Sequence, residues 1–377
     1  MSSIKRIPTL IDAGDLKHAR VVVRVGLNVP IADTGTIGEP FRLEVIIPTL
    51  KRLQQSGART LLLAHIGSTP HDSLRPVHRY LESKLGPIRF VDHLPFDAGV
   101  LESRDIALLE NIRRFEGETE NDERFAGQIA RGADMYINEA FSDSHRVHAS
   151  IVGIPRLIPS YIGPWFETEL RELTHAFDPA HPFELIVGGA KIATKLPLVK
   201  KFLDRADSVF VGGALANDLF EAQGYEVGRS LVSNDIELSD VLKHPHLVMP
   251  QDVVVEDGGG VRIGEPTSLT ARDSIMDVGP ESLVRLKKRV DTARTIVWNG
   301  PVGNTDGGYK EGTEAIAEMI RKASAHSIVG GGDTIAAISA MDAFDRFGFV
   351  STGGGAMLDY LASETLPGIE AITQYWQ

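Results

Sequence analysis

Short runs of branched apolar residues recur along the chain, and many of them end in glycine. Residues 184–190 read ELIVGGA, residues 208–215 read SVFVGGAL and residues 295–301 read TIVWNGP. Runs that stay apolar at successive positions are typical of parallel strands that are buried on both faces of a sheet. Segments with helical spacing of apolar residues, such as 41–58 with its Gly57 stop, separate the runs. This alternation predicts a doubly wound α/β architecture.

The apolar runs form two groups, and 377 residues are too many for one ordinary core. We therefore expect two Rossmann-like domains, each with a parallel sheet, joined by a hinge helix that begins within residues 159–177. The expected strands lie in residues 21–29, 60–67, 106–112, 135–141, 184–190, 208–215, 247–255, 295–301, 326–332 and 349–355.

The net charge of −12 is unevenly distributed along the chain. Residues 1–160 carry 20 basic and 20 acidic side chains, whereas the remainder carries 19 and 31. The first part also holds 16 arginines, which suit rigid recognition of phosphate or carboxylate groups. We expect the two halves to have different tasks.

Several classes of protein are excluded or disfavoured by what the sequence lacks. It has no cysteine, which excludes disulfides and thiolate metal sites, and any metal must be bound by oxygen or imidazole. No apolar run is long enough for a membrane span, and the first residues do not resemble a signal peptide, so we expect a cytoplasmic protein. Basic runs for nucleic acid, a Walker GxxxxGK[ST] loop and a strand–GxGxxG–helix unit are all missing.

The residues at the strand ends differ between the two halves. In open α/β sheets, ligands bind at the carboxyl ends of the strands. In the second half these ends are mostly glycine, which offers bare backbone for a nucleotide. In the first half they are polar and predict a pocket for a small anion, formed by Asn28, His65, Arg113, Arg114, His145 and Arg146, with Arg42 at the start of a helix. His145 and His148 could also bind zinc, but no third ligand stands nearby in the sequence, which favours anion binding by His145 and Arg146.

Three segments of the second half carry candidate phosphate and metal contacts. Asp333 in VGGGDT follows a glycine-rich strand end, where a carboxylate next to a phosphate requires a cation such as Mg²⁺; the alternative is a helix cap. Lys191 and Lys195 in GGAKIATK lie one helical turn apart and could hold a transferring phosphate, or could be solvated helix residues. In WNGPVGNTD, Asn299 could donate to a phosphate, and Asp306 is either a ribose contact or a turn residue.

Seven segments in order, RVGLNVP, LLENIRRF, HRVHAS, VGGAKIATK, WNGPVG, VGGGDT and STGGGAMLDYL, resemble the signature segments of the phosphoglycerate kinase family. The resemblance implies reversible phosphoryl transfer between 1,3-bisphosphoglycerate with ADP and 3-phosphoglycerate with ATP, with magnesium bound to the nucleotide, in a monomeric, hinge-bending enzyme of glycolysis and gluconeogenesis. It also implies a phosphoglycerate-binding domain of residues 1–160 and a nucleotide-binding domain of residues 161–362. The tail, residues 363–377, is expected to pack back on the first domain.

The resemblance also implies roles for individual residues. Arg42 would stabilise the transferring phosphoryl group, Arg113, Arg146 and His65 would bind the substrate phosphate, and Asn28 would contact the glycerate. In the nucleotide site, Lys195 would bind phosphates, Lys191 the transferring group and Asp333 the Mg²⁺. The remaining nucleotide contacts would come from Gly331, Gly332 and Thr334 at the phosphates and from Gly212, Gly213 and Pro301 at the adenine.

The chain departs from the family pattern at four positions. Gly26 stands where an aspartate meets the substrate hydroxyl, and Ser68 where an arginine binds phosphate. Glu139 and Asp306 are milder changes, an aspartate and a glutamate respectively being usual there. Arg114 is a candidate to replace the missing arginine. Two alternatives to phosphoglycerate kinase activity follow from these departures: a kinase of the same fold that acts on another small acid, and a catalytically silent nucleotide-binding relative.

Overall fold

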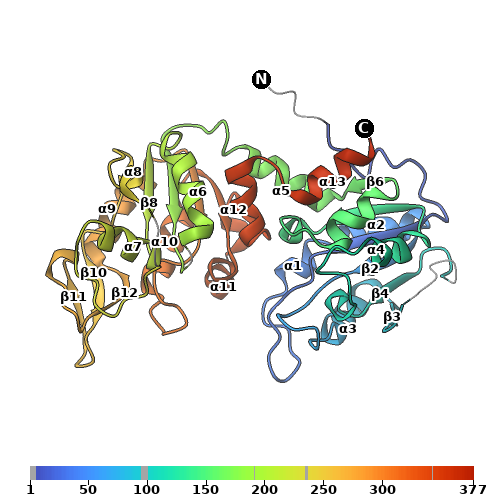
Figure 1. The fold of residues 1–377 in the computed structure, drawn as a ribbon, viewed down its shortest axis with the longest axis horizontal. Helices are drawn as coiled ribbons and strands as arrows, with labels where there is room; N and C mark the ends of the chain where they lie inside the picture. Colours follow the sequence, from blue (N-terminus) through green and yellow to red (C-terminus); the bar gives the residue numbers. More distant parts are fainter. Residues whose placement is uncertain (1–5, 95–100, 191, 234–236, 342) are drawn as a thin grey trace. The chain divides into compact units, whose positions relative to one another are not determined.

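The computed structural model describes residues 6–94, 101–190, 192–233, 237–341 and 343–377. The chain divides into two compact units: unit 1 comprises Met1–Arg171 and Thr365–Gln377, and unit 2 comprises Glu172–Glu364. The division falls inside helix α5 (Pro164–Thr174). Figure 1 shows the elements of both units along the chain. Within the described residues, no helix is long and apolar enough to cross a membrane.

Unit 1 contains a six-stranded sheet in the order β3–β4–β2–β1–β5–β6, and all of its strand pairs are parallel. Its strands are β1 (Arg20–Val25), β2 (Arg59–Leu63), β3 (Arg89–Val91), β4 (Ile106–Leu109), β5 (Met135–Glu139) and β6 (Ser160–Ile162). Its helices are α1 (Phe41–Glu44), α2 (Ile47–Ser56), α3 (Arg75–Leu85), α4 (Glu123–Ala130) and α13 (Pro367–Tyr375), with the short helices η2 (Ile112–Arg114), η3 (Phe141–Asp143), η4 (Ala149–Gly153) and η5 (Ile154–Arg156).

Both faces of the unit 1 sheet are covered by helices. Val21 and Val23 of β1 belong to one core cluster together with Leu50 of α2, whereas Val22 belongs to a second cluster with Phe125 of α4. Successive side chains of a strand point to opposite faces, so a run of valines serves two cores at once. The doubly wound architecture predicted from the apolar runs is confirmed.

The segment 41–58 forms two helices rather than one. Pro48 lies in the first turn of α2, where its missing N–H is tolerated, and the chain breaks between α1 and α2. Helix α2 ends, as expected, at Gly57, whose φ of 83° is left-handed and suits glycine.

The end of the chain returns to unit 1. Helix α13 lies beside β6 (Figure 1) and packs on η4 and η5, where Ala371 joins a small apolar cluster with Ile151 and Val152. The backbone N–H of Gly368 donates to the Ser144 carbonyl at 2.9 Å, and Trp376 Nε1 donates to the Ser160 carbonyl at 2.8 Å. The tail therefore covers the segment that follows β5.

Unit 2 contains a second six-stranded parallel sheet, in the order β15–β14–β13–β7–β8–β9. Its strands are β7 (Phe183–Val187), β8 (Ser208–Val211), β9 (Leu247–Val248), β13 (Thr295–Asn299), β14 (His326–Gly330) and β15 (Phe349–Ser351). Its helices are α6 (Ile192–Leu203), α7 (Ala214–Ala222), α8 (Ser239–Leu242), α9 (Pro280–Val290), α10 (Glu311–Lys322), α11 (Gly332–Ala340) and α12 (Gly354–Ser363), with η6 (Pro266–Ser268) and η7 (Phe344–Arg346).

Unit 2 also has a three-stranded antiparallel sheet in the order β11–β10–β12, which the sequence reading did not predict. It comprises β10 (Val253–Glu256), β11 (Val261–Gly264) and β12 (Ser274–Val278). The expectation of one strand over residues 247–255 is wrong, because this segment divides between β9 of the parallel sheet and β10 of the antiparallel sheet. Pro250 lies between them and cannot donate a backbone hydrogen bond.

Candidate functional site

Charged groups meet at the carboxyl ends of the central strands of unit 1. Arg24 comes from the end of β1, His65 from just after β2 and Asp143 from η3, and all three are buried. The Arg24 guanidinium lies 3.1 Å from Asp143 Oδ2 and 3.1 Å from His65 Nδ1, and His65 Nδ1 lies 3.4 Å from Asp143 Oδ1. One strand, one loop and one short helix thus bring a buried cation and a buried anion together.

The protonation of these groups follows from burial and from their neighbours. Burial lowers the pKa of His65, so the ring is neutral at pH 7 and its Nδ1 can accept a hydrogen bond from Arg24. Burial opposes ionisation of Asp143, but in the acid range, where a carboxyl titrates, His65 is protonated, and its charge together with that of Arg24 holds the pKa of Asp143 well below its usual range. Asp143 is therefore a permanent negative charge.

A second buried carboxyl, that of Glu118, is linked to Arg24 through Ser150. Arg24 Nε donates to Ser150 Oγ at 3.1 Å, and Ser150 donates to Glu118 through its backbone N–H (2.9 Å) and its hydroxyl (2.6 Å). Burial lowers the pKa of His148 to about 4, helped by Arg146 and Arg113, so this histidine is neutral at pH 7. The ring lies 3.8 Å from Glu118.

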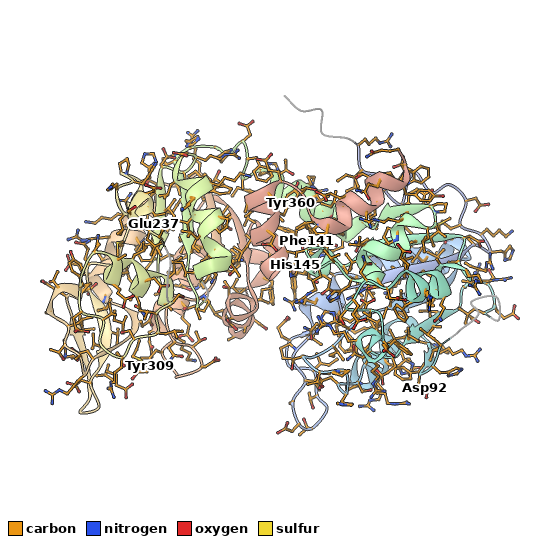
Figure 2. The ribbon with its side chains drawn as sticks, in the orientation of Figure 1. Asp92, Phe141, His145, Glu237, Tyr309 and Tyr360 are labelled. Carbon is orange, nitrogen blue, oxygen red and sulfur yellow. The ribbon has the colours of Figure 1, made fainter. Side chains whose placement is uncertain are left out.

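The more exposed side of this group is basic. Arg146 is partly exposed, and its Nε lies 3.9 Å from Asp143 Oδ1. Arg113 Nη1 donates to the Gly67 carbonyl at 3.1 Å, and burial followed by repulsion from Arg146 lowers its pKa. Two guanidinium groups that repel each other are suited to bind an anion between them. His145 directly precedes Arg146, on the segment where Figure 2 labels Phe141 and His145.

Asn28 and Arg42 line a neighbouring cavity of about 630 Å³. Arg42 Nη1 donates to the Asn28 carbonyl at 2.8 Å, and Asn28 Oδ1 accepts from the Gly67 N–H at 2.9 Å. These bonds link the loop after β2 to the loop after β1. Arg42 is thereby held at the carboxyl ends of the strands, where Arg113 and Arg146 also lie.

Gly26 and Ser68, where the chain departs from the family pattern, lie in different surroundings. A Cβ at Gly26 would lie 2.9 Å from Ser142 Oγ, so this hydroxyl occupies the space next to the missing side chain. Ser68 is exposed, on a loop that Asp72 closes by accepting from Thr69. Arg114 donates to the Pro70 and His71 carbonyls of that loop, at 3.1 and 3.4 Å.

Glu139 has a structural environment. It is buried at the end of β5 and accepts from the backbone N–H groups of Trp165 (3.0 Å) and Phe166 (3.1 Å) in the first turn of α5. Thr49 also donates to it. Burial raises the pKa of Glu139 to about 7. This residue accepts hydrogen bonds from two backbone N–H groups at the start of α5 and so caps that helix.

In unit 2, glycines at the strand ends bring backbone segments into close contact. A Cβ at Gly188 would lie 2.1 Å from the Pro301 carbonyl oxygen, and one at Gly213 would lie 2.7 Å from the Gly189 nitrogen. A Cβ at Gly212 would collide with Val302. The ends of β7, β8 and β13 can meet only because these positions lack side chains.

A cavity of about 500 Å³ opens above these glycines. Of the residues predicted from the sequence, it is lined by Gly213, Pro301, Asp306 and Asp333. Asp277 of β12 and Asn304 also line it, although the sequence reading missed both. Asp277 accepts from the Gly312 and Val278 N–H groups, and burial raises its pKa to about 6.

Lys195 lies in α6 beside the glycine strand ends and is buried. Its Nζ donates to the Gly188 carbonyl, and a Cβ at Gly189 would lie 2.2 Å from this nitrogen. Burial lowers the pKa of Lys195 to about 8, against the opposing charge of Asp333. Lys191, the other predicted lysine, lies outside the described residues.

Asp333 does not act as a helix cap. It is exposed in the first turn of α11, whose N-cap is Gly331 and which has no side-chain capping hydrogen bond. Thr334 is buried and accepts from the Gly300 N–H at 3.0 Å, while Asn299 donates weakly to the Gly354 carbonyl at 3.5 Å. Thr334 and Asn299 thus hold the backbone around the cavity, and the Asp333 carboxylate faces it.

Comparison with known proteins identifies the family. The family model described as phosphoglycerate kinase matches residues 11–364. The chain belongs to the phosphoglycerate kinase family. It is 38% identical to a phosphoglycerate kinase of Methylorubrum populi, covering 97% of this chain and 98% of that one, and 37% identical to one of Thermus thermophilus, covering 97% and 99%.

Solved structures agree with this membership. The phosphoglycerate kinase of Coxiella burnetii superposes with a TM-score of 0.82 at 33% identity, over 99% of this chain and all of that one. That of Pyrococcus horikoshii gives a TM-score of 0.85 at 28% identity, over 98% and 99%. Membership makes this chain a nucleotide-using phosphotransferase, and the predicted resemblance is confirmed.

Because Asp143 neutralises part of the charge of Arg24 and Arg146, we expect it to weaken the binding of an anion to these cations, and this is the basis of a first prediction. Asp143→Asn keeps the shape of the side chain but removes the charge, and Arg24 retains its bonds to Ser150 and to the Val25 carbonyl. We expect the affinity for inorganic sulfate to rise about tenfold, since a charge-assisted contact contributes about 1.5–3 kcal/mol. Isothermal titration calorimetry measures this affinity.

Asp134→Asn is the matched control for this experiment. It removes one negative charge from unit 1, where Asp134 forms an exposed ion pair with Arg20. This pair lies at the amino ends of the strands, whereas Asp143 lies at their carboxyl ends. This control should leave sulfate binding unchanged. Weaker sulfate binding by Asp143→Asn would show instead that the carboxylate positions the arginines for the anion.

The pKa of Lys195 leads to a second prediction. Because its pKa is lowered to about 8, the free protein loses this positive charge as the pH rises above 8, whereas an aqueous lysine stays charged. We expect the affinity for Mg-ADP to fall about tenfold between pH 7.5 and 9, and Lys195→Met to bind more weakly without this dependence. Lys200→Met, on the exposed side of α6, should keep it. An identical pH profile in Lys195→Met would contradict the assignment.

Proposed function

We propose that this chain transfers a phosphoryl group reversibly between 1,3-bisphosphoglycerate with ADP and 3-phosphoglycerate with ATP, the reaction of a phosphotransferase with a carboxyl group as acceptor. Unit 1 would bind the phosphoglycerate and unit 2 the magnesium nucleotide. The observation that carries the proposal is that the family match spans one chain with both a basic group at the strand ends of unit 1 and a glycine-lined cavity in unit 2. A cytoplasmic location and a monomeric state remain expectations from the sequence.

In unit 1, the exposed cations would bind the acceptor. Arg113 and Arg146, whose positive charges repel each other, would hold the substrate phosphate between their guanidinium groups, and His145 next to Arg146 would add a further contact. His65 is neutral and directed at Arg24, so it would act by positioning that arginine. Arg42 and Asn28 would contact the carboxyl end of the substrate, where Arg42 would stabilise charge on the group that receives the phosphoryl.

In unit 2, the residues around the cavity fit a magnesium nucleotide. The Asp333 carboxylate is a hard oxygen ligand without a capping bond, and Lys195 supplies a nearby positive charge for phosphates. Magnesium, when bound, would neutralise charge on the nucleotide phosphates. Gly213 and Pro301 would lie against the adenine, Asp306 would accept from the ribose, and Lys191 is proposed for the transferring group on the resemblance alone.

The acceptor side differs from the family pattern more than the nucleotide side. Gly26 has no side chain, and that of Ser68 is too short, to replace the substrate contacts of the usual aspartate and arginine. The buried Asp143 also neutralises part of the positive charge of Arg24 and Arg146. Arg114 is held by loop carbonyls and by Glu110 at 3.4 Å, which directs it along the Ser68 loop. We therefore expect weak binding of 3-phosphoglycerate with an otherwise complete set of transfer residues. A coupled assay with ATP, Mg²⁺ and 3-phosphoglycerate tests the activity directly.

The metal role of Asp333 is tested by Asp333→Asn. A neutral amide binds a hard cation less well than a carboxylate does, so turnover should fall at least tenfold and the Mg²⁺ concentration for half-maximal rate should rise. Steady-state assays over a magnesium series measure both quantities. Asp345→Asn, a substitution in the exposed η7 segment, serves as the control. An unchanged magnesium requirement in Asp333→Asn would exclude the metal contact.

The acceptor site is tested by restoring both missing groups in the double substitution Gly26→Asp with Ser68→Arg. The new Cβ at position 26 would lie close to Ser142 Oγ, the end of a short side chain that can rotate away. We expect the KM for 3-phosphoglycerate to fall about ten- to a hundredfold with little change in the KM for ATP, as for one or two regained charge-assisted bonds. Loss of activity in the double variant would mean that other groups have taken over the site.

A further inference from the structure

A group of three side chains in unit 2, Glu172, His175 and His326, lies near the amino end of β14. This end of the parallel sheet is opposite the glycine-rich carboxyl ends of the strands. Glu172 is in the last turn of α5 and His175 directly follows this helix, while His326 is the first residue of β14. Each offers one ligand atom, and these three atoms lie within 4.8 Å of one another. Glu172 Oε2 and His326 Nε2 lie 3.6 Å apart.

The Nε2 atom of His326 is the most informative member of this group. It is shielded from solvent, yet it has no hydrogen-bond partner among the described residues. The distance of 3.6 Å to Glu172 is too long for a hydrogen bond. It is close to the spacing of roughly 3.4 Å between two ligands that each lie about 2.0–2.1 Å from a tetrahedral zinc ion. The gap between the two atoms therefore fits a cation better than a direct contact.

The arrangement of the two imidazoles agrees with a shared ligand. The rings of His175 and His326 have centroids 5.2 Å apart and an interplanar angle of 71°, so they meet edge to face and are not stacked. His175 is exposed, which leaves one side of the group open to water. The carbonyl groups at the end of α5 add negative potential near Glu172 and His175, which favours a positive charge there.

We propose that Glu172, His175 and His326 bind one divalent transition-metal ion of the zinc class. Two imidazole nitrogens and one carboxylate oxygen are a ligand set for Zn²⁺, Co²⁺ or Ni²⁺, whereas Mg²⁺ and Ca²⁺ prefer oxygen ligands alone. With three protein ligands and an open side, water supplies the fourth position. The ion would link the end of α5 to the start of β14.

This site is separate from the proposed magnesium contact. His326 begins β14, while Asp333 follows the other end of the strand, and the strand alone spans roughly 13 Å at about 3.3 Å per residue. The inference depends on neither nucleotide binding nor phosphoryl transfer. Its failure and that of the proposed function are therefore distinguishable.

Isothermal titration of the untagged, full-length protein with ZnCl₂ at pH 7.5 tests the proposal. We expect one equivalent to bind, with the affinity lowered at least tenfold in His326→Ala, His175→Ala and Glu172→Gln. His181→Ala is the matched control, since His181 is an exposed histidine 2.6 Å from Asp207 and outside this group; it should bind zinc as the unaltered chain does. Co²⁺ bound to the unaltered protein should give a visible absorption band that His326→Ala lacks.

The fold and the kinase activity of each variant are measured alongside. His326→Ala should keep its circular dichroism spectrum and its turnover with ATP and 3-phosphoglycerate, because Nε2 of this residue makes no hydrogen bond within the described part of the chain. Should His326→Ala misfold, His326→Gln replaces it. Failure of the unaltered protein to bind zinc, or undiminished binding in the folded His326 variant, would overturn the proposal.

Discussion

Both faces of each parallel sheet are covered, and this burial decides where a ligand can bind. The residues of β1, β5, β7 and β13 are almost all inaccessible to solvent, so the strand surfaces have no room for a ligand. The loops that leave the carboxyl ends of the strands combine exposure with a rigid support. In unit 1 the residues that follow the strands include arginine, histidine and asparagine, whereas in unit 2 they are mostly glycine. One architecture thus supports a charged site and a backbone-lined site.

The two sites meet the cost of polar burial in different ways. Unit 1 buries Arg24 only with a full set of partners: Asp143, Ser150, His65 and the Val25 carbonyl. An ion so well neutralised stiffens the site but has little attraction left for a ligand, which falls to the more exposed Arg113 and Arg146. In unit 2, Lys195 has a carbonyl partner and a distant carboxylate, and its pKa falls. A phosphate would supply the counter-charge that this lysine lacks.

The fold could be predicted from the sequence because its signals are local. Runs of branched residues, the Gly57 stop and the glycine strand ends each depend on residues a few positions apart. The division of residues 247–255 between two sheets was not predicted, because it depends on pairing of β10 with β12, whose residues lie about twenty positions further along the chain. Short β3 and β6 were missed for the same reason.

The candidate site was predictable as a set of residues but not as a set of contacts. Asp143 stands two residues before His145 in the sequence, and nothing local indicates that it meets Arg24 from another strand. The buried Arg24 has a faint signal, a charge within the apolar run VVVRV. Thr334 and Asn299 were expected to face a ligand, yet they bond to the backbone of other loops. Such partners are set by long-range pairing, which a single sequence does not reveal.

The return of α13 to unit 1 has a consequence for biosynthesis. The apolar cluster of Ile151, Val152 and Ala371 and the bond from Gly368 to Ser144 require the last residues of the chain. During translation, unit 2 can emerge and fold as one continuous stretch, whereas the segment next to Asp143 stays uncovered until residues 365–377 have been made. Unit 1, whose synthesis begins first, is therefore completed only after unit 2 has been made, and a product that stops before residue 365 would lack the cover over its anion-binding segment.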